Sequence, residues 1–163
     1  MSEQTGFMKA LHSEGPANDR AEHLQLYGRL IGDWVMDATV HREDGTTLKR
    51  AGEIHFGWVL EGRAIQDVWI LPGVFHGTTL RVYDPGLGAW HILWNDPLRQ
   101  FYARQLGRAQ GKDIVQIGKN DAGVTLRWSF TDITPDSFRW LGERSRDDGK
   151  SWQLQAEFHA RRA

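Results

Sequence analysis

From residue 33 onward, apolar and polar residues alternate with a period of two, which is the period of a β-strand. The clearest run places Leu126, Trp128 and Phe130 on one face and Thr125, Arg127 and Ser129 on the other. The last strand alternates in the same way. Its inner face is expected to carry Trp152, Leu154, Ala156 and Phe158, and its outer face Gln153, Gln155, Glu157 and His159.

Turn signals separate these alternating runs at regular intervals. They are Asp44-Gly45, Glu61-Gly62, Pro72-Gly73, Pro85-Gly86, Asp96-Pro97, Gln110-Gly111, Ala122-Gly123, Pro135-Asp136 and Asp148-Gly149. Nine turns connect about ten strands, and sequential strands without intervening helices pair as antiparallel neighbours. Closure of the sheet removes its two exposed edges. The sequence therefore predicts an all-β protein with a closed up-and-down antiparallel barrel.

The N-terminal region differs from the rest of the chain. Residues 1–17 are small, polar and punctuated by Gly and Pro, so we expect a mobile arm there. Residues 19–31 have apolar positions at helical spacing, with Asp19 and Glu22 as a capping signal and Gly32 at the C-terminal end. This helix is expected to cap one mouth of a single barrel domain over residues 18–163.

Three strands have two comparably apolar faces. In the strand over residues 63–71, either Asp67 or Gln66 can point inward. The inward face of the strands over residues 79–84 and 90–95 is equally open. The pattern of these segments does not choose between the two faces.

Eight tryptophans in 163 residues indicate either a thick aromatic core or a stacking pocket, because the indole buries a large surface and keeps an N–H that needs a partner. For the pocket reading, the candidate ligand-binding residues are Trp69, Trp90, Trp94, Tyr102, Trp128 and Trp140. The absence of cysteine excludes disulfides and thiolate chemistry, and it is compatible with the cytoplasm, where we expect the protein.

Charge and hydropathy narrow the classes of partner. The formal net charge of −1, with charges interspersed, provides no basic surface for nucleic acid. The N-terminus lacks the pattern of a signal peptide, and no run of apolar residues is long enough to span a membrane as a helix. The expected partner is a small apolar or aromatic molecule. A homodimer is compatible with the sequence.

Recognisable catalytic motifs are missing from the sequence. It has no nucleophile elbow, phosphate-binding loop, dinucleotide fingerprint or zinc-protease motif. Acid–base chemistry inside the barrel remains open, and Asp67, His91 and Arg81 are its candidate residues. We expect no metal site, since no His-x-His pair exists and Glu157 and His159 fall on an outer face.

Short motifs resemble those of lipocalins and related calycins. Gly32-Asp33-Trp34, between a helix and the first long strand, resembles their G-x-W signature, and Tyr83-Asp84-Pro85 and the final Asp-Gly-Lys-Ser-Trp hairpin resemble segments of bacterial lipocalin-like domains. The resemblance covers roughly residues 24–163. It implies that Gly32 and Trp34 form the plug of the closed end and that an arginine near the C-terminus packs across Trp34, with Arg161 or Arg162 as the match. It carries no single activity with it.

Haem is an alternative that the same resemblance raises, because the nitrobindins among the calycin relatives bind haem through a barrel histidine. His91 and His159 are the candidate ligands here. The nitrobindin extension G-x-W-x-G-x-G has no match, since Val35, Met36 and Asp37 follow Trp34. We therefore expect no cofactor.

The sequence favours a barrel that binds a small apolar or aromatic molecule in an aromatic-lined cavity. Two alternatives remain open. The first is an acid–base enzyme of the isomerase, cyclase or dehydratase type that acts on such a ligand. The second is a structural or interaction module whose barrel is filled with side chains.

Overall fold

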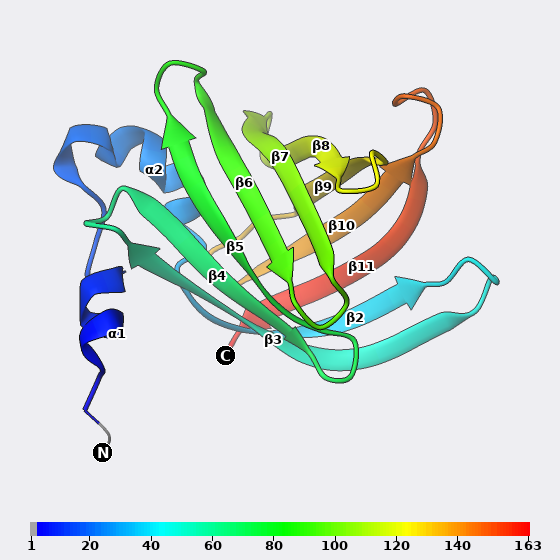
Figure 1. Ribbon diagram of the computed structural model, residues 1–163, viewed down its shortest axis with the longest axis horizontal. Coiled ribbons are helices and arrows are strands. Elements are labelled where there is room, and N and C mark those ends of the chain that lie inside the picture. Colours follow the sequence, from blue (N-terminus) through cyan, green and yellow to red (C-terminus); the bar gives the residue numbers. More distant parts are fainter. Residues whose placement is uncertain (1–2) are drawn as a thin grey trace.

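The alternating segments form strands, and each expected turn lies between two of them. The computed structural model describes residues 3–163 (Figure 1). The strands are β1 (His12–Ser13), β2 (Gly32–His41), β3 (Thr47–Val59), β4 (Ala64–Leu71), β5 (Phe75–Asp84), β6 (Ala89–Asp96), β7 (Phe101–Gln110), β8 (Asp113–Asn120), β9 (Thr125–Thr131), β10 (Ser137–Ser145) and β11 (Gln153–Arg162). The helices are α1 (Gly6–Leu11), the 3-10 turn η1 (Asn18–Arg20) and α2 (Ala21–Gly28).

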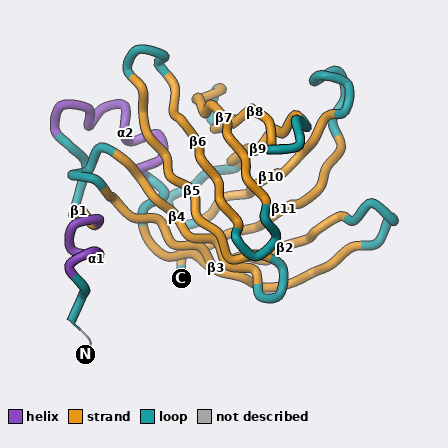
Figure 2. Tube along the Cα trace, viewed as in Figure 1, coloured by secondary structure: helices purple, strands orange, loops and turns teal. Residues whose placement is uncertain are grey.

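Strands β2 to β11 close into a barrel. Each pairs antiparallel with the strand that precedes it and the strand that follows it, and β11 returns to β2, from Ala156 opposite Val40 to Arg162 opposite Trp34. Figure 2 shows how much of the chain these strands occupy. The prediction of a closed ten-stranded up-and-down barrel is confirmed. None of the helices within residues 3–163 is long and apolar enough to cross a membrane.

The helix before the barrel is shorter than predicted. It spans α2 alone, because the chain after Gly28 tightens into i→i+3 hydrogen bonds and Gly32, with φ of 125°, already begins β2. Asp19 provides no cap, and the position before the helix is Arg20. Leu24, Tyr27 and Leu30 are fully buried, so α2 and the turn after it cap one end of the barrel as expected.

The segment expected to be a mobile arm contains α1 and β1. His12 and Ser13 pair with Val59 and Trp58 on the edge of β3 that extends past β2. The Ala17 N–H donates to the carbonyl of Gly62, which attaches the arm to the β3–β4 turn.

The structure resolves the three strands whose inner face the sequence left open. Asp67 points inward with Ile65 and Trp69, and Gln66 is on the other face of β4. Arg81 is inward in β5, and Trp94 is inward in β6. The outward faces are apolar too, which is why periodicity could not decide.

Trp34 closes the end of the barrel beneath α2. Its indole is 1 % exposed, its Nε1 donates to the Leu30 carbonyl at 2.8 Å, and the Phe138 ring lies edge-on at 4.7 Å. The guanidinium of Arg162, 4.0 Å from the ring centroid, packs across it and donates to the carbonyls of Arg29 and Ile31. Gly32 stands beside this guanidinium, where a Cβ would meet Arg162 Nη1.

Of the two candidate arginines, Arg162 and not Arg161 is therefore the one at the plug. Arg162 is opposite Trp34 in the strand register and shares its inward face, whereas Arg161 points outward and donates to Asp37 at 3.0 Å. Adjacent residues of a strand point to opposite faces, so only one of the two arginines can reach the plug.

Candidate functional site

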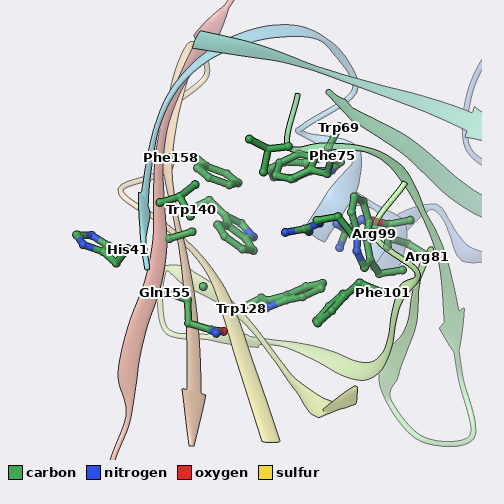
Figure 3. Close-up of a pocket in the computed structure, with 16 residues that line it drawn as sticks. His41, Trp69, Phe75, Arg81, Arg99, Phe101, Trp128, Trp140, Gln155 and Phe158 are labelled. Carbon is green, nitrogen blue, oxygen red and sulfur yellow. The ribbon is translucent and has the colours of Figure 1, made fainter. Parts of the chain in front are cut away.

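The barrel contains a cavity of about 210 Å³ at the end opposite α2 and Trp34. It is lined by Val40, His41, Trp69, Val74, Phe75, Thr79, Arg81, Trp94, Arg99, Phe101, Trp128, Trp140, Gly142, Gln155, Ala156 and Phe158. Most of these side chains are aromatic or aliphatic, and Figure 3 shows aromatic rings on several sides of the space. This hollow half of the barrel is the candidate site.

Indole rings form much of the wall. Trp69 and Trp128 both pack against Trp140 with ring centroids 5.7 Å apart, and Trp94 meets Trp128 edge-on at 6.3 Å. Phe158 stacks on Trp140 at 4.7 Å. These rings hold one another in place, so the aromatic surface is preformed.

Two glycines make room for the indoles. A Cβ at Gly77 would lie 2.5 Å from Cη2 of Trp94, and a Cβ at Gly142 would lie 2.6 Å from Cη2 of Trp140. Real Cβ atoms do not come so close to a ring carbon. The two tryptophans can therefore lie flat against the sheet only because both positions are glycine.

A buried polar network forms the floor of the cavity. Arg81, 2 % exposed, donates through Nε to Asp67 Oδ2 at 2.8 Å and through Nη1 to Gln116 Oε1. The other oxygen of Asp67 accepts the Thr79 backbone N–H at 3.0 Å. Tyr27, from α2, donates its hydroxyl to the same Gln116 oxygen at 2.8 Å. The network joins the capping helix to the cavity floor.

Burial dominates the titration of Tyr27. Its complete desolvation raises the pKa of the phenol well above the ordinary range, and the neighbouring Arg81 guanidinium offsets only part of that effect. Tyr27 therefore stays protonated and acts as a hydrogen-bond donor. It also provides the ring over which Arg81 lies, 4.7 Å from the centroid.

The Trp69 indole carries an unsatisfied donor. Its Nε1 is buried and has no hydrogen-bond partner within residues 3–163, although the side chain lines the cavity. Leaving a buried donor unpaired costs about 1–3 kcal/mol. Because this nitrogen has essentially no accessible surface, Trp69 lines the cavity with other atoms of its ring.

Arg99 lies at the mouth of the cavity. Its guanidinium packs over the rings of Phe75 and Phe101, at 5.3 and 5.7 Å from their centroids, and its Nε donates to Asp96 Oδ2 at 2.6 Å. Asp96 is fully buried, and its other oxygen accepts the backbone N–H groups of Leu98 and Arg99. This carboxylate fixes the turn that carries the arginine.

A β-bulge brings Gln155 to the cavity. Gly142 pairs with Ala156 but Glu143 pairs with Leu154, so Gln155 is the extra residue. The expected inner face of β11 is therefore right for Ala156 and Phe158. Before the bulge the inward and outward faces exchange. Leu154 is outward because it pairs with the outward Glu143. Gln153 is on the inward face, because it pairs with Arg144, which in turn pairs with the inward Leu126.

Trp152 precedes the bulge and is also outside, where its ring packs on the Arg127 guanidinium at 4.2 Å. The expectation that it faces inward is corrected for this reason. A bulge reverses the alternation for every residue before it in the strand, and no residue type marks its position here.

Four of the six predicted ligand-binding residues come together at the cavity: Trp69, Trp94, Trp128 and Trp140. Trp90 and Tyr102 do not, and their assignment is corrected. Trp90 points inward, but it is four residues from Trp94 along β6, which corresponds to about 13 Å along the strand. It therefore lies deeper in the barrel, where its ring centroid is 4.8 Å from that of Tyr27. Tyr102 is on the outer face of β7 and bonds Gln100 at 2.6 Å.

The cavity also contains residues that the sequence reasoning missed, namely Phe75, Arg99, Phe101 and Gln155. Phe75 and Phe101 begin strands directly after turns and therefore reach the barrel mouth. Position at the start of a strand was the available signal for these two. The turn residue Arg99 offered no periodicity to interpret.

The three candidate catalytic residues do not converge. Asp67 and Arg81 form the buried ion pair of the floor, whereas His91 points out of the barrel and bonds Asp84 Oδ2 at 2.9 Å. Trp90 and Ile92, the inward neighbours of His91, fix this orientation. The nomination of His91 as an acid or base inside the barrel is therefore wrong.

The histidines proposed as haem ligands do not reach the cavity either. His159 is exposed on the outer face of β11, bonded to Glu157 at 2.8 Å, and His91 is outside β6. His41 borders the cavity at the end of β2, but Figure 3 shows its ring on the far side of the strand. Within residues 3–163, neither proposed haem ligand borders the cavity and the ring of His41 is turned away from it, so these residues do not fit the haem alternative.

Comparison with known structures places the fold. The crystal structure of Rv2717c from M. tuberculosis aligns with a TM-score of 0.64 and 16 % identity, over 88 % of this chain and 98 % of that chain. The S-type phycobiliprotein lyase CPES from Guillardia theta aligns with a TM-score of 0.61 and 12 % identity, over 91 % and 98 %. No protein-family model and no curated protein sequence matches the chain.

These two alignments cover almost the whole of each chain and show a shared barrel fold. Fold and site together define the class. It is a closed up-and-down β-barrel, with one end filled and capped by a helix and the other end hollow and aromatic.

Proposed function

We propose that the barrel binds a small, planar, largely apolar aromatic molecule. The observation that carries this proposal is the cavity at the mouth, in which four indoles and three phenyl rings surround about 210 Å³. Aromatic walls favour a flat ligand because rings pack against rings in stacked or edge-on geometry. Burial of apolar ligand surface supplies the affinity.

The volume sets the size of the ligand. A cavity of about 150 Å³ accommodates benzene, so 210 Å³ suits one substituted ring or two fused rings. This is smaller than the several hundred cubic ångströms of a typical pocket for a drug-sized molecule. The closed half of the barrel is filled by Trp34, Trp90, Phe130 and Tyr27, which restricts the ligand to the mouth.

Binding is favoured over the two alternatives. A filled structural barrel would have no need for indoles around an open space. Of the three candidate residues for acid–base catalysis, only Asp67 and Arg81 point inward, and they are already bonded to each other. The geometry thus supports a binding site in which the polar groups orient the ligand.

Calorimetric titration with 2-naphthalenemethanol tests the proposal. We expect saturable binding in the micromolar range, about −8 kcal/mol. The Ala156→Trp variant places an indole in the cavity and is expected to weaken binding at least about ten-fold, a loss of roughly 1.4 kcal/mol. Ala51→Trp, the same change at an exposed site on β3, is the matched control and should bind like the parent.

Two results would count against the proposal. One is the absence of any heat or fluorescence response up to millimolar probe. The other is equal weakening by Ala156→Trp and Ala51→Trp, because binding would then take place outside the cavity.

A further inference from the structure

The polar side chains that line the cavity are mostly hydrogen-bond donors. Indole and guanidinium groups donate and cannot accept, and six lining residues carry them: Trp69, Arg81, Trp94, Arg99, Trp128 and Trp140. Among the lining side chains, acceptors are limited to Thr79, Gln155 and the outward ring of His41. No carboxylate lines the cavity.

The two carboxylates nearest the site are already satisfied behind the arginines. Asp67 accepts from Arg81 and from the Thr79 backbone, and Asp96 accepts from Arg99 and two backbone N–H groups. Each carboxylate holds the Nε edge of its arginine. Arg81 Nη1 also donates to Gln116, whereas in the described part of the chain neither terminal nitrogen of Arg99 bonds a carboxylate.

Several donors have no protein partner within residues 3–163. They are both terminal nitrogens of Arg99 and Nη2 of Arg81. Figure 3 draws Arg81 and Arg99 on the side of the cavity away from Trp140 and Phe158. A carboxylate substituent on a ligand held by those rings would be directed toward this side of the cavity.

From this arrangement we infer that the ligand is an aromatic anion of the carboxylate class, with its ring among the tryptophans and its carboxylate toward Arg99 and Arg81. A planar guanidinium matches a carboxylate in bidentate geometry. The inference rests on the proposed function and adds to it the charge and orientation of the ligand.

Three probes of similar size distinguish this inference from the proposed function: 2-naphthoate, 2-naphthalenemethanol and 2-naphthylmethylammonium. Each is titrated calorimetrically at about pH 7, where the first is anionic and the last is cationic. We expect the anion to bind at least about ten-fold more tightly than the alcohol, as a charge-assisted hydrogen bond allows. The cation should bind most weakly.

Equal affinity for anion and alcohol, or a preference for the cation, would overturn this inference and leave the proposed function in place. Failure of all three to bind would instead overturn the proposed function.

Variants then locate the selectivity. Arg99→Met should lower the anion-to-alcohol affinity ratio by about three-fold or more. Arg104→Met removes an outward arginine of β7 and is the control, with an unchanged ratio. A ratio preserved in Arg99→Met would contradict the assigned carboxylate position. If a variant fails to fold, the selectivity of the parent protein among the three probes decides the inference.

Discussion

Replacing Trp34 with alanine is expected to lower the free energy of unfolding by about 3–5 kcal/mol. The change removes a fully buried indole, its hydrogen bond to the Leu30 carbonyl and the ring on which Arg162 packs. A loss of this size is a large share of the stability of a typical domain. Denaturant unfolding followed by circular dichroism measures it.

Trp152→Ala is the matched control for this prediction. The same side chain is removed, but from the half-buried outer face, where its contact is Arg127. We expect a loss of about 1 kcal/mol or less. Similar losses for the two variants would show that Trp34 is not the plug of the closed end.

Asp67→Leu is expected to destabilise the fold by about 3–5 kcal/mol, because it leaves the Arg81 guanidinium charged and unpaired in the barrel interior. Asp67 is completely buried and its partner 2 % exposed, and Asp67 is the only carboxylate bonded to Arg81 within residues 3–163. The midpoint of urea unfolding reports the effect.

The double variant Asp67→Leu with Arg81→Met tests whether the loss of stability comes from leaving one charge of the pair without its partner. Removing both charges at similar volume is often close to neutral, so we expect most of the loss to be recovered. Tyr27 still donates to Gln116 in this variant, so the capping helix keeps its polar contact. A double variant as unstable as the sum of the two single changes would contradict the view that the buried charges depend on each other.

The sequence predicted the architecture because turns and alternation are local properties. All nine expected turns separate observed strands. Leu126, Trp128 and Phe130 share the inward face of their strand, as the alternation predicted. The closure of β11 onto β2 followed from the need to remove exposed edges. These features depend on residue type and spacing alone.

The depth of a residue in the barrel and the position of a bulge could not be predicted in this way. Trp90 and Trp94 are both on the inward face of β6, but Trp90 packs against Tyr27 of α2 whereas Trp94 lines the cavity. The bulge at Gln155 changes the faces of Trp152 and Leu154 through tertiary pairing with β10. The choice between Arg161 and Arg162 likewise depended on strand register.

The cytoplasmic location, the homodimer and the absence of a cofactor remain predictions of the sequence. The ligand and its charge are proposals that rest on the cavity.

The most direct test of the account observes the eight indole N–H signals by NMR while 2-naphthalenemethanol is added, with each signal assigned by a Trp→Phe variant. We expect the signals of Trp69, Trp94, Trp128 and Trp140 to shift saturably, since these indoles line the cavity. The signals of Trp34, Trp58, Trp90 and Trp152 should move little. Shifts confined to the second group, or no shift in any signal, would contradict ligand binding in the aromatic mouth of the barrel.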